Sequence, residues 1–76
     1  MSNNNNQPPP WSEAPPWAMW RAQDYNGDWY AFDMEPEKNE DAWWWWTPNN
    51  LYALLLETHI VNPNWRDTLQ KRPENE

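Results

Sequence analysis

The chain has 76 residues, a length that allows one small domain. It contains no cysteine, which excludes a disulfide framework and a thiolate metal site and fits a reducing cytoplasm. Twelve acidic and five basic residues give a net charge of −7, so the basic footprint of a nucleic-acid-binding protein is missing. An acidic surface can instead attract a basic surface on another protein.

The N-terminal sequence MSNNNNQPPPW has neither the basic start nor the apolar run of a signal peptide. No stretch approaches the ~20 apolar residues of a membrane span. We therefore expect no contact with a membrane and a location in the cytoplasm. Residues 1–16 are dominated by Asn, Gln and Pro and predict a disordered or extended tail. Trp11 in this tail is interpreted as solvent-exposed, as loosely docked, or as an anchor inserted into a neighbouring chain.

The first folding signal is a hairpin pattern that begins near Trp17. Asn26-Gly27 is its turn, because both residues tolerate a positive φ, and Gly27 is the only glycine in the chain. The alternation after the turn predicts that one set of side chains faces the core: Tyr30, Phe32 and Met34. Before the turn, Trp20 and Ala22 share one face of the strand, and Trp17, Met19 and Arg21 share the other.

Pro36 ends the second predicted strand, and the charged segment 35–41 is a predicted loop. The run Trp43 to Trp46 is predicted as a third strand that starts near Ala42. Residues 49–61 fit two patterns. Thr47-Pro48 resembles the start of a helix, whereas the alternation and the β-forming residues of 51–61 favour a strand over at least part of this range. We favour the strand.

The C-terminal sequence predicts a short helix over 65–72, capped by Asn64 and stopped by Pro73. The predicted fold class is therefore mainly β. It is a small antiparallel meander of about three to four strands with a short C-terminal helix and a Pro/Asn-rich N-terminal tail. The predicted domain organisation is a tail over 1–16, a single small β-rich domain over 17–73 and a charged tail over 74–76.

Three segments in this order resemble very small bacteriophage and prophage proteins: WAMWRAQDYNGDWYAFDMEP, the tryptophan-rich strand, and NPNWRDTLQKRP. The resemblance covers about residues 17–73, and its C-terminal part is the most specific, with Thr68 where serine is usual. The tandem tryptophans and the leucine run depart from the usual pattern. The resemblance implies a phage origin, expression inside a bacterial host and a small β-meander. Short phage proteins of this size often inhibit or modulate host proteins, and such a role is suggested here by analogy with them.

Catalytic chemistry finds little support in the sequence. His59 is the only histidine, and its apolar surroundings favour a structural residue over a base or a ligand. Metal-binding, phosphate-binding and nucleophile motifs are missing. We expect a non-enzymatic protein without a cofactor or a metal.

Nine tryptophans are more than a thin sheet with one covered face can bury. Two of the tandem indoles, with Trp17 or Trp29, should form an exposed apolar patch, and such patches mark interaction sites. The face is then covered by a second copy, a host protein or a flat ligand, unless the N-terminal tail folds back over it. The predicted binding residues are Trp43, Trp44, Trp45, Trp46, Trp17, Trp29, Glu35, Glu37, Glu40 and Asp41.

Two functions stay open on these grounds. The first is a homo-oligomeric phage protein that inhibits or modulates a host protein, such as a defence factor, through the aromatic patch and the acidic loop. The alternative is an oligomeric sponge that stacks a nucleotide immune signal on tryptophan. Its ligand residues would be Arg21, Arg66, Trp20 and Trp65, since each arginine neighbours a tryptophan.

Overall fold

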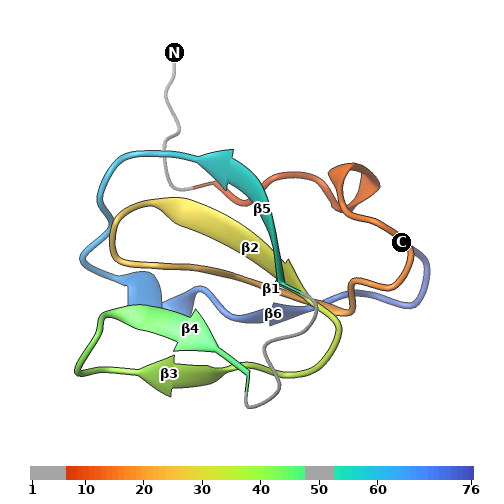
Figure 1. Ribbon diagram of the computed structural model, residues 1–76. Helices are drawn as coiled ribbons and strands as arrows, with labels where there is room; N and C mark the ends of the chain where they lie inside the picture. Colours follow the sequence, from red (N-terminus) through yellow and green to blue (C-terminus); the bar gives the residue numbers. More distant parts are fainter. Residues whose placement is uncertain (1–6, 48–52) are drawn as a thin grey trace.

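The computed structural model describes residues 7–47 and 53–76, which form two antiparallel sheets and two short 3₁₀ helices (Figure 1). The larger sheet has the strand order β5-β2-β1-β6, and the smaller sheet pairs β3 with β4. The elements are η1 (Trp11–Glu13), β1 (Trp20–Gln23), β2 (Asp28–Phe32), β3 (Glu37–Asn39), β4 (Trp44–Trp46), β5 (Ala53–Thr58), η2 (Trp65–Asp67) and β6 (Gln70–Lys71). The prediction of a mainly β fold is confirmed.

The β1–β2 hairpin forms as the sequence predicts, with Trp20 opposite Phe32 and Gln23 opposite Trp29. Gly27 has a φ of 99°, and its N–H donates to the Asp24 carbonyl at 2.9 Å. Asn26 does not have a positive φ, so the turn is a type I turn closed by a left-handed glycine. A Cβ at Gly27 would lie 2.3 Å from the His59 carbonyl oxygen, so this close approach also requires glycine.

The tryptophan run does not extend the main sheet, and the expected simple meander is wrong in this respect. Residues 37–39, expected as a loop, instead form β3 and pair with β4 in a separate hairpin. The place next to β2 is taken by β5, in antiparallel register with a bulge at Trp29/Tyr30. The predicted strand within 51–61 is thereby confirmed over Ala53–Thr58, whereas Pro48 and the possible helix start lie outside the described residues.

One face of the main sheet is covered by the β3–β4 hairpin and by η2. The buried side chains on this face are Ala22, Phe32, Trp45 and Trp65, with Trp20, Tyr25, Tyr30 and Leu69 partly buried around them. The predicted core-facing orientation is confirmed for Phe32, and Tyr30 is partly buried in the same cluster. Trp20 and Ala22 lie on one face of β1, as predicted. Met34, also predicted to face the core, is 43% exposed, because β2 ends at Phe32 before reaching it.

The opposite face is covered by the N-terminal segment of the same chain. Trp11 is only 4% exposed and packs with Ala14, Ala18 and Ala31, with Leu56 alongside. The guanidinium carbons of Arg21 and Arg72 lie 4.2 and 5.4 Å from the centroid of the Trp11 ring. Arg72 also donates to the carbonyls of Pro15 and Ala18 at 2.9 and 3.0 Å. Trp11 is therefore a core residue, neither exposed nor available as an anchor for another chain.

The C-terminal helix expected over 65–72 is not formed. Only η2 is helical there, Asn64 makes no side-chain cap, and Gln70 and Lys71 pair with β1 as the edge strand β6. A helix of so few residues is marginal by itself because nucleation is unfavourable. The Thr68 hydroxyl instead accepts the Gln23 N–H at 2.8 Å, which turns the chain onto the sheet edge.

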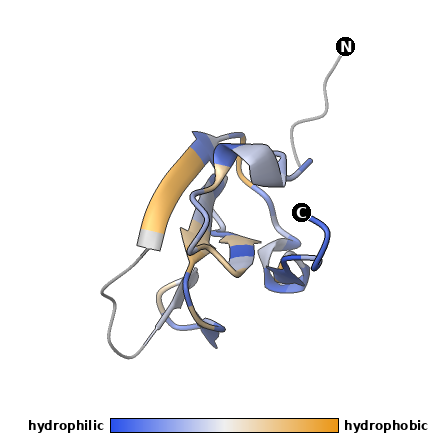
Figure 2. Cartoon of the chain, turned by 90° about the vertical axis from the view of Figure 1, so that its right-hand side faces the viewer, coloured by the Kyte–Doolittle hydropathy of each residue, from blue (hydrophilic) through white to orange (hydrophobic). Residues whose placement is uncertain are grey.

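The apolar residues that remain at the surface of the main sheet gather on β5, which is the orange strand in Figure 2. Leu54 and Leu55 are 42% and 47% exposed. Among the described residues, β5 has a hydrogen-bonded neighbour on one side only, which is β2.

No helix in the described parts of the chain is long and apolar enough to cross a membrane.

Replacing Trp11 by alanine tests whether the N-terminal segment belongs to the core. Trp11→Ala should lower the free energy of unfolding by about 3 to 5 kcal/mol, because a buried indole is deleted. Urea denaturation followed by circular dichroism measures this change. The matched control is Trp17→Ala, which removes an indole that is 40% exposed and should lower stability by less than about 1.5 kcal/mol. Equal losses would contradict the assignment of Trp11 to the core.

Candidate functional site

Three tryptophans of the β3–β4 hairpin point into solvent. Trp43, Trp44 and Trp46 are 49%, 49% and 37% exposed, and we call these three residues the indole surface. In the hairpin register, Trp44 lies opposite Asn39 and Trp46 opposite Glu37, so these four side chains share the outward face. The sequence prediction that some of the tandem indoles are exposed agrees with this placement.

Trp45 points the other way and fastens the hairpin to the main sheet. It is 7% exposed, and its Nε1 donates to the carbonyls of Gln23 and Trp65 at 3.1 and 3.2 Å. The Trp45 and Trp65 rings meet edge-to-face, with centroids 6.1 Å apart. Trp45 was predicted as a binding residue, but its indole is enclosed and serves as the anchor of the site.

Trp43 has a φ of 68°, a left-handed conformation that glycine or asparagine adopts more easily. Its N–H donates to the Asn39 carbonyl at 2.8 Å, and its own carbonyl accepts the Tyr25 N–H at 3.1 Å. The Trp43 ring meets Tyr25 at a centroid distance of 4.5 Å and an angle of 80°. These contacts hold a bulky residue in an unfavourable backbone conformation and keep half of its indole in solvent.

Two other predicted tryptophans lie away from the indole surface. Trp29 is 1% exposed, so its assignment to an exposed patch is wrong. It points to the same face of β2 as Ala31, and that face is covered by the N-terminal segment. Trp17 is 40% exposed but precedes β1, on the N-terminal segment and outside the hairpin.

The predicted acidic residues are mostly brought next to the indoles. Glu37, Glu40 and Asp41 line a surface hollow of about 550 Å³ together with Trp46. Glu35 lies in a neighbouring hollow on the side of Trp45 and Arg66. Two weak contacts reach Glu40, from Lys38 at 3.9 Å and from Arg66 at 3.8 Å. Such exposed pairs contribute little to stability, so the acidic groups remain available to a partner.

Asp24 and Tyr25, in the β1–β2 turn, are site residues that sequence reasoning missed. The Asp24 carboxylate accepts the Trp45 N–H at 2.8 Å and so connects this turn to β4. Burial raises the pKa of Asp24 to about 6; the Trp45 hydrogen bond opposes the rise, and the nearby Asp28 carboxylate adds to it. In the sequence, DYNGD marks only a turn, and nothing in it signals contact with a strand about 20 residues later.

The residues predicted for a nucleotide sponge do not form one site. Arg21 lies on the Trp11 side of β1, where it donates to the Pro9 carbonyl and to Gln70. Arg66 lies on the other side of the sheet, over the ring of Trp65 at 5.0 Å. Trp65 is 1% exposed, and Trp20 is partly buried in the same core, so neither offers an open stacking face.

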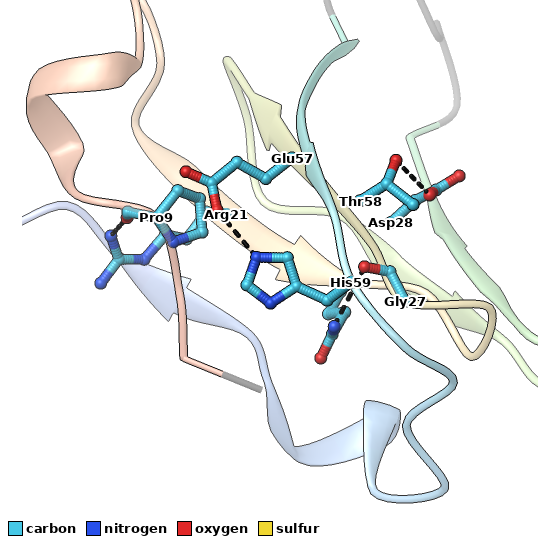
Figure 3. A network of polar contacts seen from close by, with 8 residues as sticks. Pro9, Arg21, Gly27, Asp28, Glu57, Thr58 and His59 are labelled. Carbon is cyan, nitrogen blue, oxygen red and sulfur yellow. Dashed lines mark hydrogen bonds and ion pairs between the residues drawn. The ribbon is translucent and has the colours of Figure 1, made fainter. Parts of the chain in front are cut away.

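His59 has a structural environment, as the sequence indicates. Figure 3 shows its ring directed at the Glu57 carboxylate, at a distance of 2.8 Å, beside the β1–β2 turn. The His59 contact lowers the pKa of Glu57, and the His59 backbone N–H donates to the Gly27 carbonyl at 2.9 Å. In the described residues, no group of three or more His, Asp and Glu side chains is arranged to hold a metal ion.

Comparison of the chain with protein-family models, curated proteins and solved structures gives no match.

The half-buried carboxylate of Asp24 predicts a pH-dependent stability. Because its folded pKa of about 6 exceeds the ordinary 3.8, the folded state keeps this proton while the unfolded state loses it. The contribution of Asp24 to stability therefore falls as the pH rises from about 4 to about 6. Asp24→Asn retains an acceptor for the Trp45 N–H and removes the titration. The variant should gain about 1 to 2 kcal/mol relative to wild type across this window, since water still reaches the carboxylate.

Urea unfolding at a series of pH values from 4 to 7.5 measures this gain. Parallel stability curves for the wild type and Asp24→Asn would contradict the assigned titration.

Proposed function

We propose that this chain is a non-enzymatic binding protein that docks on another protein through its indole surface. The observation that carries the proposal is the outward display of Trp43, Trp44 and Trp46 on a hairpin anchored by Trp45. Tryptophan is enriched among the residues that dominate binding energy at protein interfaces. Its large rigid ring loses little conformational entropy when it is buried by a partner.

The acidic residues beside the indoles favour a partner with a basic surface. Glu37, Glu40 and Asp41 adjoin Trp46, and the whole chain has a net charge of −7. Charges at the rim of an interface mainly accelerate association and select the partner. The indoles then supply contact area and the carboxylates supply orientation.

We propose a host protein of a bacterium as the partner, with a host defence factor as one candidate, and the host cytoplasm as the place of action. This part of the proposal is supported by the resemblance of residues 17–73 to small phage proteins. Binding through the indole surface would inhibit or modulate the host protein, because a docked chain occupies a surface that the protein needs for its own contacts.

Deleting two outward indoles tests the docking role. The variant Trp44→Ala/Trp46→Ala should lose at least about tenfold in affinity for the partner and keep most of its stability, because both rings are substantially exposed. Tagged protein incubated with host lysate, followed by quantitative mass spectrometry, measures the recovery of the partner.

The control is Met19→Ala, which removes a side chain that is 42% exposed outside the hairpin. It should recover the partner as the wild type does. A partner recovered equally by the double variant and by the wild type would exclude the indole surface as the docking site.

We also propose self-association, through the edge strand β5. The expectation of a homo-oligomer arose from an uncovered sheet face, and the N-terminal segment covers that face within the chain. The apolar edge strand is a different basis for pairing, because an edge with exposed leucines can add an antiparallel strand from a second copy.

Sedimentation velocity tests this self-association at tens of micromolar. Wild-type protein should sediment as a dimer, and Leu55→Lys should be monomeric, since two lysines cannot be accommodated at a symmetric strand pair. Ile60→Lys is the control, because Ile60 is 58% exposed and lies beyond the end of β5. A monomeric wild type would contradict the pairing.

A further inference from the structure

A third hollow lies between the β1–β2 turn and the loop that precedes β4. Its volume is about 440 Å³, and its aromatic lining consists of Tyr25, Trp43 and Trp44. Asp24 and Asp41 are also among the residues that line this hollow. The site therefore combines flat rings with negative charge, which is the composition of a receptor for an organic cation.

The Tyr25 and Trp43 rings pack edge to face, with planes inclined at 80° and centroids 4.5 Å apart. Trp43 nevertheless remains 49% exposed, so part of its indole is open to a partner. Among the described residues, no ion pair involves Asp24 or Asp41. Arg66 lines a different hollow together with Tyr25 and Trp43, where it lies over Trp65 and near Glu40.

The chain itself contains four cation–ring contacts among the described residues, and the three shortest are made by arginine. Arg21 and Arg72 lie over Trp11 at 4.2 and 5.4 Å, and Arg66 lies over Trp65 at 5.0 Å, whereas Lys71 lies over Trp20 at 6.0 Å. In the case of Trp11, these contacts fasten two distant segments of the chain to each other. The hollow at Trp43 offers the same kind of ring face, with carboxylates added and without an arginine of the chain in its lining.

We propose that this hollow receives an arginine side chain of the partner protein, with its guanidinium over the Trp43 indole and facing the carboxylates of Asp24 and Asp41. Arginine fits better than lysine because its guanidinium is planar, stacks on aromatic rings and binds carboxylates through several N–H groups. The proposal rests on the proposed function, since it names the residue type that the partner presents to the site.

The left-handed backbone of Trp43 provides a clean variant for the test. A bulky residue at a φ of 68° carries a conformational cost that glycine does not carry. Trp43→Gly relieves this cost while it removes the contact with Tyr25, an interaction of similar size. The variant therefore folds, and a loss of binding reports on the indole itself.

The probe is a short acetylated glycine–serine peptide amide with one central arginine, compared with the same peptide carrying citrulline. Citrulline has nearly the shape of arginine without its charge. In a titration followed by ¹H–¹⁵N NMR at low salt, the arginine peptide should shift the indole N–H signals of Trp43 and Trp44 and the amide of Tyr25. The citrulline peptide should bind at least about fivefold more weakly.

Trp43→Gly and Asp41→Asn should each weaken the arginine peptide by at least about fivefold. Trp46→Ala is the matched control, because Trp46 belongs to the indole surface but not to the lining of this hollow, and it should change the affinity by less than about twofold. Equal binding of the two peptides, or signals shifted elsewhere in the molecule, would overturn the assignment of the hollow to arginine.

The outcome is separable from that of the proposed function. If the peptide fails to bind while capture of a host partner still depends on Trp44 and Trp46, only the arginine assignment falls. If partner capture is independent of these indoles, the docking role of the hairpin falls whether or not the hollow binds arginine.

Discussion

The contact of the Trp45 indole with β1 and η2 determines how the rest of the tryptophan run is displayed. Its ring N–H reaches two backbone carbonyls, and its backbone N–H reaches the Asp24 carboxylate, so the middle residue of β4 is held from two sides. Because side chains alternate along a strand, this one buried ring directs Trp44 and Trp46 outward. The outward orientation of Trp44 and Trp46 thus follows from the core contact of Trp45.

Much of the main sheet follows from local patterns. The alternation around Gly27 predicts the β1–β2 hairpin because one glycine satisfies both the backbone conformation and the close approach of His59. The predictions of secondary structure are wrong where contacts between residues far apart in the sequence determine the conformation. Residues 65–72 have caps and charges suited to a helix, yet Thr68 bonds Gln23 and the following residues pair with β1. The polar segment 37–39 has little strand propensity of its own and becomes a strand through pairing with the tryptophan run.

For the candidate site, the sequence indicates an excess of indoles but leaves open which of them faces outward. The alternation of side chains along a strand allows either Trp45 or its two neighbours to face the core. Trp45 faces the core because the hydrogen bonds of its ring and backbone are satisfied there. Trp29 was misplaced because the covering of its face depends on the packing of Trp11, which a Pro-rich segment does not reveal. Asp24 and Tyr25 escaped notice because the hollow joins two turns that are remote in the chain.

Because some indoles are buried and others are exposed, the tryptophans of this chain also fall into two groups that differ in their fluorescence emission. Trp11, Trp29 and Trp65 are shielded from water, which shifts indole emission to shorter wavelengths, whereas Trp43 and Trp44 emit from contact with water. Quenchers dissolved in the solvent reach the second group and not the first. Intrinsic fluorescence therefore distinguishes an event at the hairpin surface from an opening of the core, with no label attached to the chain.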